Sequence, residues 1–358
     1  AEGAHWRWQR RAAAPAFSHR NMLNLAPIMT TAAERSCARI AQAGPRAIDF
    51  LGEMVTTTFD VISDVTFSGD DTFDRNAVHG AIDDYIAEAG KISLFDILGF
   101  PDWVPRPGRI TSGKALREMK QVADRAIDDR SRRGNTGTPD LLDLLLQGED
   151  PKTKRRMNTA ELRDNLLTFI VAGHETTALT LSWSLYLMGF DQSVQEKARA
   201  EAQSVLGGRA ATGADLENLP YTRQIIDEAL RLYPPAGIIS RTACKPDTLG
   251  GREIRSGDTV MIPIYALGRN RLLWDDPDAF RPERFEDRKN IDRYAYLPFG
   301  DGPRICIGAS FALQEAVIIL ATLLSRFRFT PVPGKDPEPV MILTLRPDGG
   351  VWLKADLL

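Results

Sequence analysis

Cysteine is scarce in this sequence, with only Cys37, Cys244 and Cys306 among its 358 residues. Three scattered thiols cannot form the disulfide framework of a small secreted domain, and they favour a reducing, cytoplasmic location. Neither a CxxC nor an HxxxH pair occurs, which excludes the usual zinc-binding patterns. Residues 1–11 also lack the apolar core of a secretory signal peptide.

The sequence also lacks a large excess of positive or negative residues. The 45 Lys and Arg residues nearly balance the 48 Asp and Glu residues, and the net charge of −3 offers no electrostatic basis for binding nucleic acid. Hydrophobic residues make up 43% and charged residues 26%, as in soluble globular proteins. This composition excludes a disordered or fibrous chain.

One apolar run, Leu166 to Phe190, is long enough to span a bilayer. His174 and Glu175 lie near its middle, and a central acid costs about 2.5–3.5 kcal/mol on membrane-insertion scales. A helix that is apolar all round is typical of the centre of a large protein. We therefore expect a buried core helix rather than a membrane span.

The hydrophobic patterning predicts a mainly α protein with a small β part, or α+β class. Length alone suggests roughly two domains of about 150 residues. Residues 1–233 are expected to be mostly helical, and residues 234–358 to combine strands, a glycine-rich loop and one last helix. The predicted helices cover 27–43, 46–67, 76–94, 111–133, 158–189, 191–206, 220–233 and 309–327, and the predicted strands cover 238–243, 260–266 and 341–345.

The glycine-rich loop, FGDGPRICIG at 299–308, directly precedes the last predicted helix. Cys306 therefore lies just before a helix N-terminus, where exposed N–H groups favour an anion and lower a thiol pKa. The position indicates a thiolate ligand or nucleophile, and a small buried residue beside a turn is an equally supported alternative. Cys37 and Cys244 have no comparable setting and are interpreted as structural or surface thiols.

Two other motifs begin but are not completed. The HE pair at 174–175 starts a zinc-protease HExxH pattern, but Ala178 stands where the second histidine belongs. The GDG stretch at 300–302 starts a dinucleotide-binding fingerprint, but Ile305 replaces its third glycine and no βαβ unit surrounds it. Neither chemistry is predicted.

Four motifs, in order along the chain, resemble those of the cytochrome P-450 family of haem-thiolate monooxygenases. They are AGHETT at 172–177, EALR at 228–231, PERF at 282–285 and FxxGxRxCxG at 299–308. The resemblance runs from about Trp6 to the C-terminus. It implies the P-450 fold as a single domain over 1–358, with a long central helix over haem b (iron protoporphyrin IX).

By this resemblance Cys306 is the thiolate ligand of the haem iron, a ligand that favours O–O cleavage. Arginines suit the haem propionates because a guanidinium binds carboxylates in a fork geometry. Surface cations, and core packing for Phe299, are the alternatives. The implied haem-binding residues are Trp6, Arg10, Ala172, Gly173, Arg241, Phe299, Gly300, Arg304, Cys306 and Gly308.

Glu175 and Thr176 resemble the family's acid–alcohol pair, which supplies protons for oxygen activation. A threonine in mid-helix can bond the carbonyl four residues back and bend or open the helix. A buried glutamate is costly unless it is paired or functional. Small residues recur along the same helix at Gly173, Thr180 and Ser184, so haem and oxygen, or another helix, can approach its backbone closely.

Glu228 and Arg231 stand three residues apart on one predicted helix and can pair. Arg284, from PERF, would complete a buried triad by resemblance. Removing one partner of such a network costs about 3–5 kcal/mol. We interpret the triad as a structural clamp beneath the haem-binding loop.

Apolar residues occupy the positions of the family's substrate contacts, so a hydrophobic small molecule is implied. The motif style favours fatty acids and other long hydrocarbons, and terpenoids are the alternative. The implied contacts are Ile170, Val171, Ala172, Ala236, Gly237, Ile238, Ile239, Met341 and Ile342.

The family's usual N-terminal strands, helices and pocket-roofing loop have no counterpart here, and we expect an incomplete sequence, in which a membrane anchor could also be missing. No flavin or iron–sulfur motif is present, so the electrons are expected from a ferredoxin or flavodoxin with its reductase. Arg7, Arg11 and the Cys306 loop would form a basic docking face. A solvated basic face is the alternative.

The resemblance thus implies a monooxygenase that hydroxylates its substrate with O₂. A peroxide-driven peroxygenase of the same fold is a second hypothesis, which the Glu175-Thr176 pair disfavours because a peroxide user needs no relay for dioxygen protonation. A non-catalytic haem-binding fragment is the third.

Overall fold

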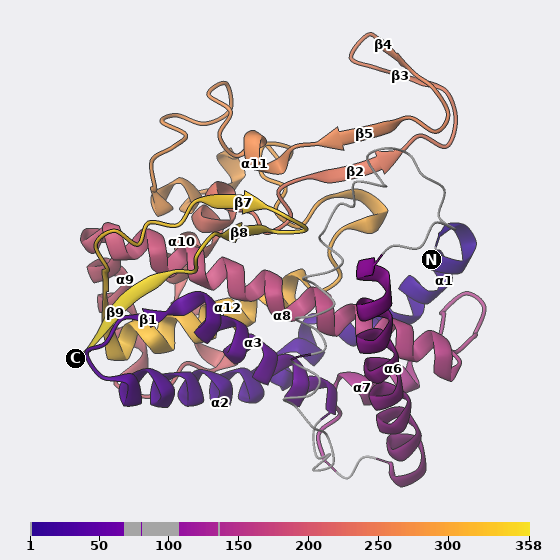
Figure 1. Cartoon of the computed structure of the whole chain (residues 1–358), viewed down its shortest axis with the longest axis horizontal. Helices are drawn as coiled ribbons and strands as arrows, with labels where there is room; N and C mark the ends of the chain where they lie inside the picture. Colours follow the sequence, from indigo (N-terminus) through magenta and orange to yellow (C-terminus); the bar gives the residue numbers. More distant parts are fainter. Residues whose placement is uncertain (1, 68–79, 81–106, 135–136) are drawn as a thin grey trace.

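The computed structural model describes residues 2–67, 80, 107–134 and 137–358, and it is built mainly from helices (Figure 1). The helices are α1 (Gly3–Ala13), α2 (His19–Ala43), α3 (Phe50–Phe67), α6 (Pro107–Arg133), α7 (Leu141–Gln147), α8 (Thr159–Phe190), α9 (Gln192–Leu206), α10 (Pro220–Leu232), α11 (Ile264–Leu267) and α12 (Ala309–Arg326). Short 3-10 turns are η1 (Ala14–Phe17), η2 (Gly213–Asn218), η3 (Pro282–Phe285), η4 (Arg288–Asn290) and η5 (Gly302–Arg304).

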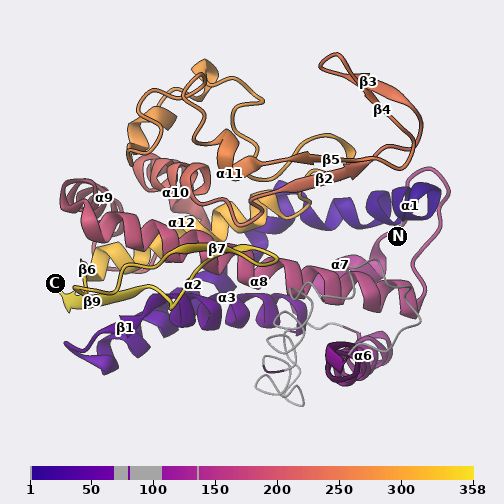
Figure 2. The same ribbon diagram turned by 45° about the horizontal axis from the view of Figure 1, so that its top comes forward.

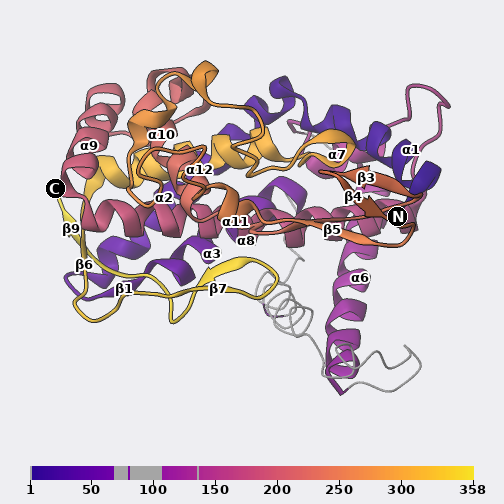
Figure 3. The ribbon, with the colours of Figure 1, turned by 90° about the horizontal axis from the view of Figure 1, so that it is seen from above.

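The long helix α8 runs through the middle of the molecule and packs against α3, α6, α10 and α12 (Figures 1 and 2). Seen from above, α6 extends away from this helical body, and the two chain ends lie at opposite ends of the molecule (Figure 3). The apolar faces of α2, α3, α8, α10 and α12 meet in one continuous core. The site described below lies against this core, so its walls are fixed by helix packing.

Most predicted helices are present within a few residues of their expected bounds. The helix predicted from residue 27 begins earlier, at His19, and keeps Pro27 inside it, because Met22 and Leu25 bury their side chains and extend the packed face. The hydrophobic pattern did not indicate α7, although Asp140 and Asp143 form a capping box at its start. The predicted helix 76–94 lies outside the described residues.

The strands form small antiparallel sheets. β2 (Ile239–Thr242) pairs with β5 (Thr259–Ile262), β3 (Asp247–Leu249) with β4 (Arg252–Ile254), and β7 (Pro339–Met341) with β8 (Leu345–Pro347). A further sheet joins an early segment to the C-terminal part of the chain, because β1 (Ile48–Asp49), β9 (Trp352–Leu357) and β6 (Phe327–Pro331) pair in the order β1-β9-β6. The helical first part and the mixed second part therefore share a sheet.

Two predicted strands are partly wrong. The run 260–266 ends as a strand at Ile262 and continues as α11 after Pro263, because proline cannot donate a hydrogen bond to a sheet ladder. The run 341–345 contains the tip of the β7–β8 hairpin, where the Ile342 N–H donates to the Thr344 carbonyl at 3.2 Å. An apolar run this short cannot distinguish a hairpin tip from a strand.

One helix among the described residues, α12, is long and apolar enough to cross a membrane by length and composition. Of that stretch, 72% is buried inside the fold, as in the core helix of a globular protein. The apolar run in α8 is likewise enclosed, and every residue from Thr177 to Leu185 is buried. Both helices serve as core helices here.

The three residues expected to form a triad lie together beside α10. Arg231 donates from Nε and Nη2 to the two Glu228 carboxylate oxygens, each at 2.7 Å, and Arg284 Nε donates to Glu228 at 3.2 Å. The Arg231 and Glu228 side chains are fully enclosed. The remaining Arg231 donors bind the carbonyl oxygens of Gly268, Pro277 and Ala279. The network therefore ties α10 to the long connection that leads to residues 299–308.

We expect Arg231→Leu to lower the free energy of unfolding by about 3–5 kcal/mol, because the Glu228 charge would remain buried without its main partner. Arg132→Ala on α6 is the control. It removes an exposed ion pair with Asp129, worth less than about 1 kcal/mol. Urea denaturation measures both, and similar losses for the two variants would contradict the clamp.

Candidate functional site

Cys306 closes an irregular loop immediately before α12. Gly300 and Gly302 adopt φ values of 71° and 76°, in the left-handed region that glycine enters without steric cost. The Cys306 N–H donates to the Phe299 carbonyl at 2.9 Å and fixes the end of the loop. The thiol itself is exposed and lines a cavity.

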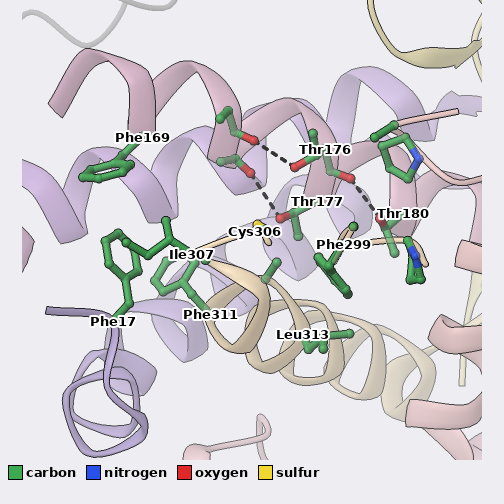
Figure 4. Close-up of a pocket in the computed structure, with 18 of the residues that line it drawn as sticks. Phe17, Phe169, Thr176, Thr177, Thr180, Phe299, Cys306, Ile307, Phe311 and Leu313 are labelled. Atoms are coloured by element: carbon green, nitrogen blue, oxygen red, sulfur yellow. Dashed lines mark hydrogen bonds between the residues drawn. The ribbon is translucent and has the colours of Figure 1, made fainter. Parts of the chain in front are cut away.

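This cavity, of about 510 Å³, lies between α8, α12 and the Cys306 loop, and its size suits a small organic ligand. In Figure 4, Thr176 and Thr177 of α8 face Cys306 and Phe299 from the opposite side. Segments far apart in the sequence thus meet at one site. The predicted residues in its wall are Trp6, Arg10, Ala172, Gly173, Thr176, Ala236, Ile239, Arg241, Phe299, Gly300, Arg304, Cys306 and Gly308.

Three threonines of α8 border the cavity, and each donates its hydroxyl proton to a helix carbonyl (Figure 4). Thr176 donates to Ala172 at 2.9 Å, Thr177 to Gly173 at 3.1 Å, and Thr180 to Thr176 at 2.9 Å. The helix is continuous through these residues, so the opening that a mid-helix threonine can cause does not occur. Each hydroxyl oxygen keeps lone pairs that can accept a hydrogen bond.

Three arginines supply positive charge to the cavity wall. Arg10 donates to the Ile305 carbonyl at 2.7 Å, and Arg241 donates to the Ser240 carbonyl at 2.8 Å. The Arg304 guanidinium lies 4.3 Å from the centre of the Trp6 ring. These contacts orient the cations. A guanidinium has five N–H donors, so the single hydrogen bond given for each of Arg10 and Arg241 leaves further donors for a ligand.

Arg11, expected on an open docking face, is instead paired. It donates from Nε and Nη2 to the Asp150 carboxylate at 2.7 Å each, and these bonds hold the pKa of Asp150 well below its usual range. Arg7 is exposed. Of the two arginines named for that face, Arg7 alone keeps an exposed, unpaired side chain within the described residues.

Glu175 lies away from the cavity, although it adjoins Thr176 in the sequence. Its side chain is 4% exposed, accepts a hydrogen bond from Thr344 at 2.9 Å and pairs with Arg346 at 3.1 Å. Neighbouring residues of a helix do not share a face. The structure therefore separates the expected acid–alcohol pair, with the alcohol at the cavity and the acid against the β7–β8 hairpin.

The expected lowering of the Cys306 pKa is wrong for the protein alone. Although Cys306 is exposed to the cavity, the protein atoms around its thiol displace enough water to raise its pKa, and the Gly308 N–H and the Arg10 charge lower it by a smaller amount. The surrounding protein thus outweighs the helix N-terminus. A metal ion deprotonates a thiol that coordinates it, so the raised pKa does not exclude a ligand role.

Of the implied substrate contacts, Ala172, Ala236 and Ile239 belong to the cavity wall. The others lie elsewhere because an apolar run indicates burial or packing without saying against what. Ile170 is buried in the core, and Val171 packs against it. Three are exposed outside the wall, namely Ile238 just before β2 and Met341 and Ile342 of the β7–β8 hairpin, and Gly237 packs closely against Met341.

Sequence reasoning missed most of the apolar wall. Phe17 and Phe169 are two of the missed wall residues, and the centres of their rings lie 5.0 Å apart in an edge-to-face contact (Figure 4). Their spacing in the sequence looks like that of any core residue, so no signal could have found them. The sequence could have identified Thr177, because it is the second threonine of the AGHETT motif. The missed wall residues include Phe17, Met22, Leu25, Ile62, Val65, Leu141, Phe169, Thr177, Ile226, Leu230, Phe311, Ala312, Leu313 and Ala316.

Comparison with known proteins points to one family. A family model described as cytochrome P450 matches residues 1–354. The chain is 35% identical to cyclooctatin synthase of Streptomyces melanosporofaciens over 96% of its length and 75% of that protein. It is 40% identical to cyclooctat-9-en-7-ol 5-monooxygenase of the same organism, over 66% of this chain and 52% of that protein. It is 32% identical to bifunctional cytochrome P450/NADPH–P450 reductase 2 of Bacillus subtilis, over 96% of this chain and 33% of that protein.

The three thiols should differ in reactivity, because burial raises the pKa of Cys37 to about 11 whereas Cys244 is exposed. At pH 8 the thiolate fraction of Cys37 is on the order of 10⁻³. Brief alkylation with iodoacetamide, followed by peptide mass spectrometry, should label Cys244 first and Cys37 only after unfolding. Equal labelling of the two would show that α2 opens readily and would contradict the packing described.

Proposed function

The chain belongs to the cytochrome P450 family, and we propose that it inserts one oxygen atom of O₂ into a hydrophobic small molecule. The family implies haem, and one of the relatives above is named as a monooxygenase, a class of oxidoreductase. The cavity bordered by Cys306, Thr176 and three arginines is the observation that carries the proposal. The whole chain, 1–358, would form one haem domain.

The donor set of the cavity fits haem b. Cys306 would supply the thiolate ligand, and the Gly308 N–H, which donates to its sulfur, would moderate the sulfur charge. Arg10, Arg241 and Arg304 would bind the propionates. When bound, the haem supplies the redox chemistry of oxygen activation, and thiolate ligation favours O–O cleavage.

Thr176 is proposed to hold a proton at the α8 wall. Its hydroxyl proton is directed to the Ala172 carbonyl at 2.9 Å, and its oxygen can accept a hydrogen bond from a water molecule in the cavity. Proton transfer through one positioned water is an effective geometry for general acid catalysis. Glu175 can take part in such a transfer only after its carboxylate leaves Arg346.

A substrate with few polar groups suits the cavity, because apolar residues supply most of its wall. One relative is named for oxidising cyclooctat-9-en-7-ol. That name shifts our proposal from fatty acids toward a hydrocarbon skeleton that carries a single hydroxyl group.

The electrons are proposed to come from a separate ferredoxin or flavodoxin with its reductase, in the cytoplasm. The Bacillus subtilis relative is named as a fusion with a reductase, whereas this sequence shows no flavin or iron–sulfur motif. Arg7 and the Cys306 loop would form the docking face without Arg11.

The proposal is tested by the absorption spectrum of the reduced protein under carbon monoxide. We expect a strongly red-shifted Soret band, lost in Cys306→Ser and retained in Cys244→Ser, which changes an exposed thiol outside the cavity wall. A band typical of histidine- or thiol-ligated haem, or no haem, would overturn the proposal.

Thr176→Ala should uncouple oxygen consumption from product formation. We expect product formation to fall on the order of 10²-fold, the lower range for general acid catalysis, and hydrogen peroxide to accumulate. Thr168→Ala is a matched control, because Thr168 makes the same bond to a carbonyl four residues back, at 2.7 Å, but lies outside the cavity wall. Equal coupling in both variants would remove Thr176 from the mechanism, and turnover with peroxide alone at a matching rate would favour a peroxygenase.

A further inference from the structure

Helix α1 is held in place differently from the other described helices that border the cavity. Those others each contribute several residues to the continuous core, and they are α2, α3, α7, α8, α10 and α12. Of α1, which the structure describes in full, Ala13 in the last turn alone belongs to that core. Trp6 and Arg10 nevertheless supply part of the cavity wall. Contacts outside the apolar core must therefore fix the position of this helix.

A loop between α7 and α8, residues 149–156, contacts α1 on a side other than the cavity wall. The Asp150 carboxylate accepts hydrogen bonds from Arg11 Nε and Nη2 at 2.7 Å each, and its side chain has no exposed surface. The Arg155 guanidinium lies 3.9 Å from the centre of the Trp8 ring. We call these two contacts, Arg11–Asp150 and Trp8–Arg155, the α1 latch.

The loop is fixed internally, and Asp150 is at its centre. Its carboxylate also accepts hydrogen bonds from the Thr153 hydroxyl at 2.8 Å and from the Lys152 N–H at 3.2 Å. Its backbone N–H donates to the Arg155 carbonyl at 2.9 Å, and its carbonyl accepts from the Lys154 N–H at 2.8 Å. A buried charge is costly unless it is paired and hydrogen-bonded. The same carboxylate therefore closes the loop and binds α1.

The latch is joined to the start of α8. One Glu161 carboxylate oxygen accepts from Arg155 Nη2 at 2.7 Å, and the other accepts from the Asn158 N–H of the capping box at 3.0 Å. In the next turn, Asn165 donates to the Gln9 side chain at 2.7 Å. Because α8 belongs to the continuous core, the latch ties α1 to a helix that is itself fixed by packing.

The contacts of α1 are polar for the most part, and one is imperfect. Trp8 is 6% exposed, but its indole N–H has no hydrogen-bond partner among the described residues, which costs free energy in the closed position. On the cavity side, Arg10 donates to the Ile305 carbonyl and Arg304 lies over the Trp6 ring. Elements with few buried apolar contacts open at a lower free-energy cost than core helices do. We therefore expect α1 to be the wall helix that opens first.

We propose that the α1 latch keeps α1 closed against bound haem and sets how fast haem is released. Asp150 and Arg155 are positioning residues, since both contact α1 and neither borders the cavity. A rigid macrocycle between packed helices can leave only when one wall moves, and elements that move belong to the least stable part of a fold. In release the Cys306 sulfur gives up the iron and takes a proton from water, with no change of oxidation state. The inference rests on the proposed haem-thiolate function and goes beyond it.

Haem transfer from the ferric protein to excess apomyoglobin measures the release rate. We expect Arg155→Ala to raise this rate about 2- to 5-fold, the effect of losing one exposed cation–π contact. Arg155→Lys keeps a cation over Trp8 and should restore most of the difference. Arg156→Ala is the matched control, because this neighbouring arginine pairs with Glu149 at 4.0 Å instead of with α1.

Asp150→Asn is the stronger test. It removes the charge from a bidentate pair, and we expect release to be about tenfold faster or more. Hydrogen exchange should show that both latch variants open α1 locally, with faster exchange in residues 3–13 and unchanged exchange in α8 and α12. A variant that weakens the whole fold, such as Arg231→Leu, should raise exchange in all three helices. Arg155→Ala keeps the proposal testable if Asp150→Asn does not fold.

Three results would overturn the proposal. They are a release rate in Arg155→Ala and Asp150→Asn equal to that of Arg156→Ala, faster exchange in α1 without faster release, and faster release that accompanies exchange in β2 instead, whose cavity residues also lie outside the core. The carbon monoxide spectrum of each sample is recorded first. A sample without the red-shifted band contradicts the proposed function, whereas a sample that has the band and fails the release test contradicts the latch alone.

Discussion

The ion pair between Arg231 and Glu228 is the contact on which the position of the site most depends. Arg231 donates hydrogen bonds to the Glu228 carboxylate and to three backbone carbonyls between residues 268 and 279. A guanidinium without solvent contact must satisfy all its donors inside the protein, and this requirement fixes the path of the chain beside α10. The Cys306 loop and α12 follow that connection, so the thiol reaches the cavity from a defined direction.

The polar side chains of α8 show how a core helix can border a reactive site. Its threonines donate hydrogen bonds to helix carbonyls, so their hydroxyl protons have partners and the helix stays continuous. The two acids next to them are treated differently by their surroundings. Glu175 is compensated by Arg346, whereas Glu315 meets no charge among the described residues and is stabilised in its neutral form. The two acids beside this helix therefore differ in their partners, because one pairs with a cation and the other meets only a hydroxyl group.

Prediction from the sequence succeeded where a pattern reports a local property. The periodic apolar runs of α8 and α12 identified them as helices, and the glycines at 300 and 302 identified a loop that needs left-handed residues. Prediction from the sequence failed where contacts with residues far along the chain determine the local structure. Pro263 ends β5 within an apolar run, and the tip at 342–344 turns an expected strand into the β7–β8 hairpin. The apolar wall, such as Phe17 and Phe169, carries no signal that separates it from the core.

The sequence by itself determined the chemistry that can gather at the site, because side-chain type and motif spacing are local properties. It identified Cys306, Arg304 and Thr176, all of which border the cavity. The tertiary structure alone decided which partner each buried acid meets and which side chains border the cavity. Burial and pairing depend on elements distant in the sequence: β8 brings Arg346 to Glu175, and α12 brings Glu315 to Thr177. The same residue type therefore has different electrostatic surroundings at the two positions, and those surroundings set the cost of a buried charge.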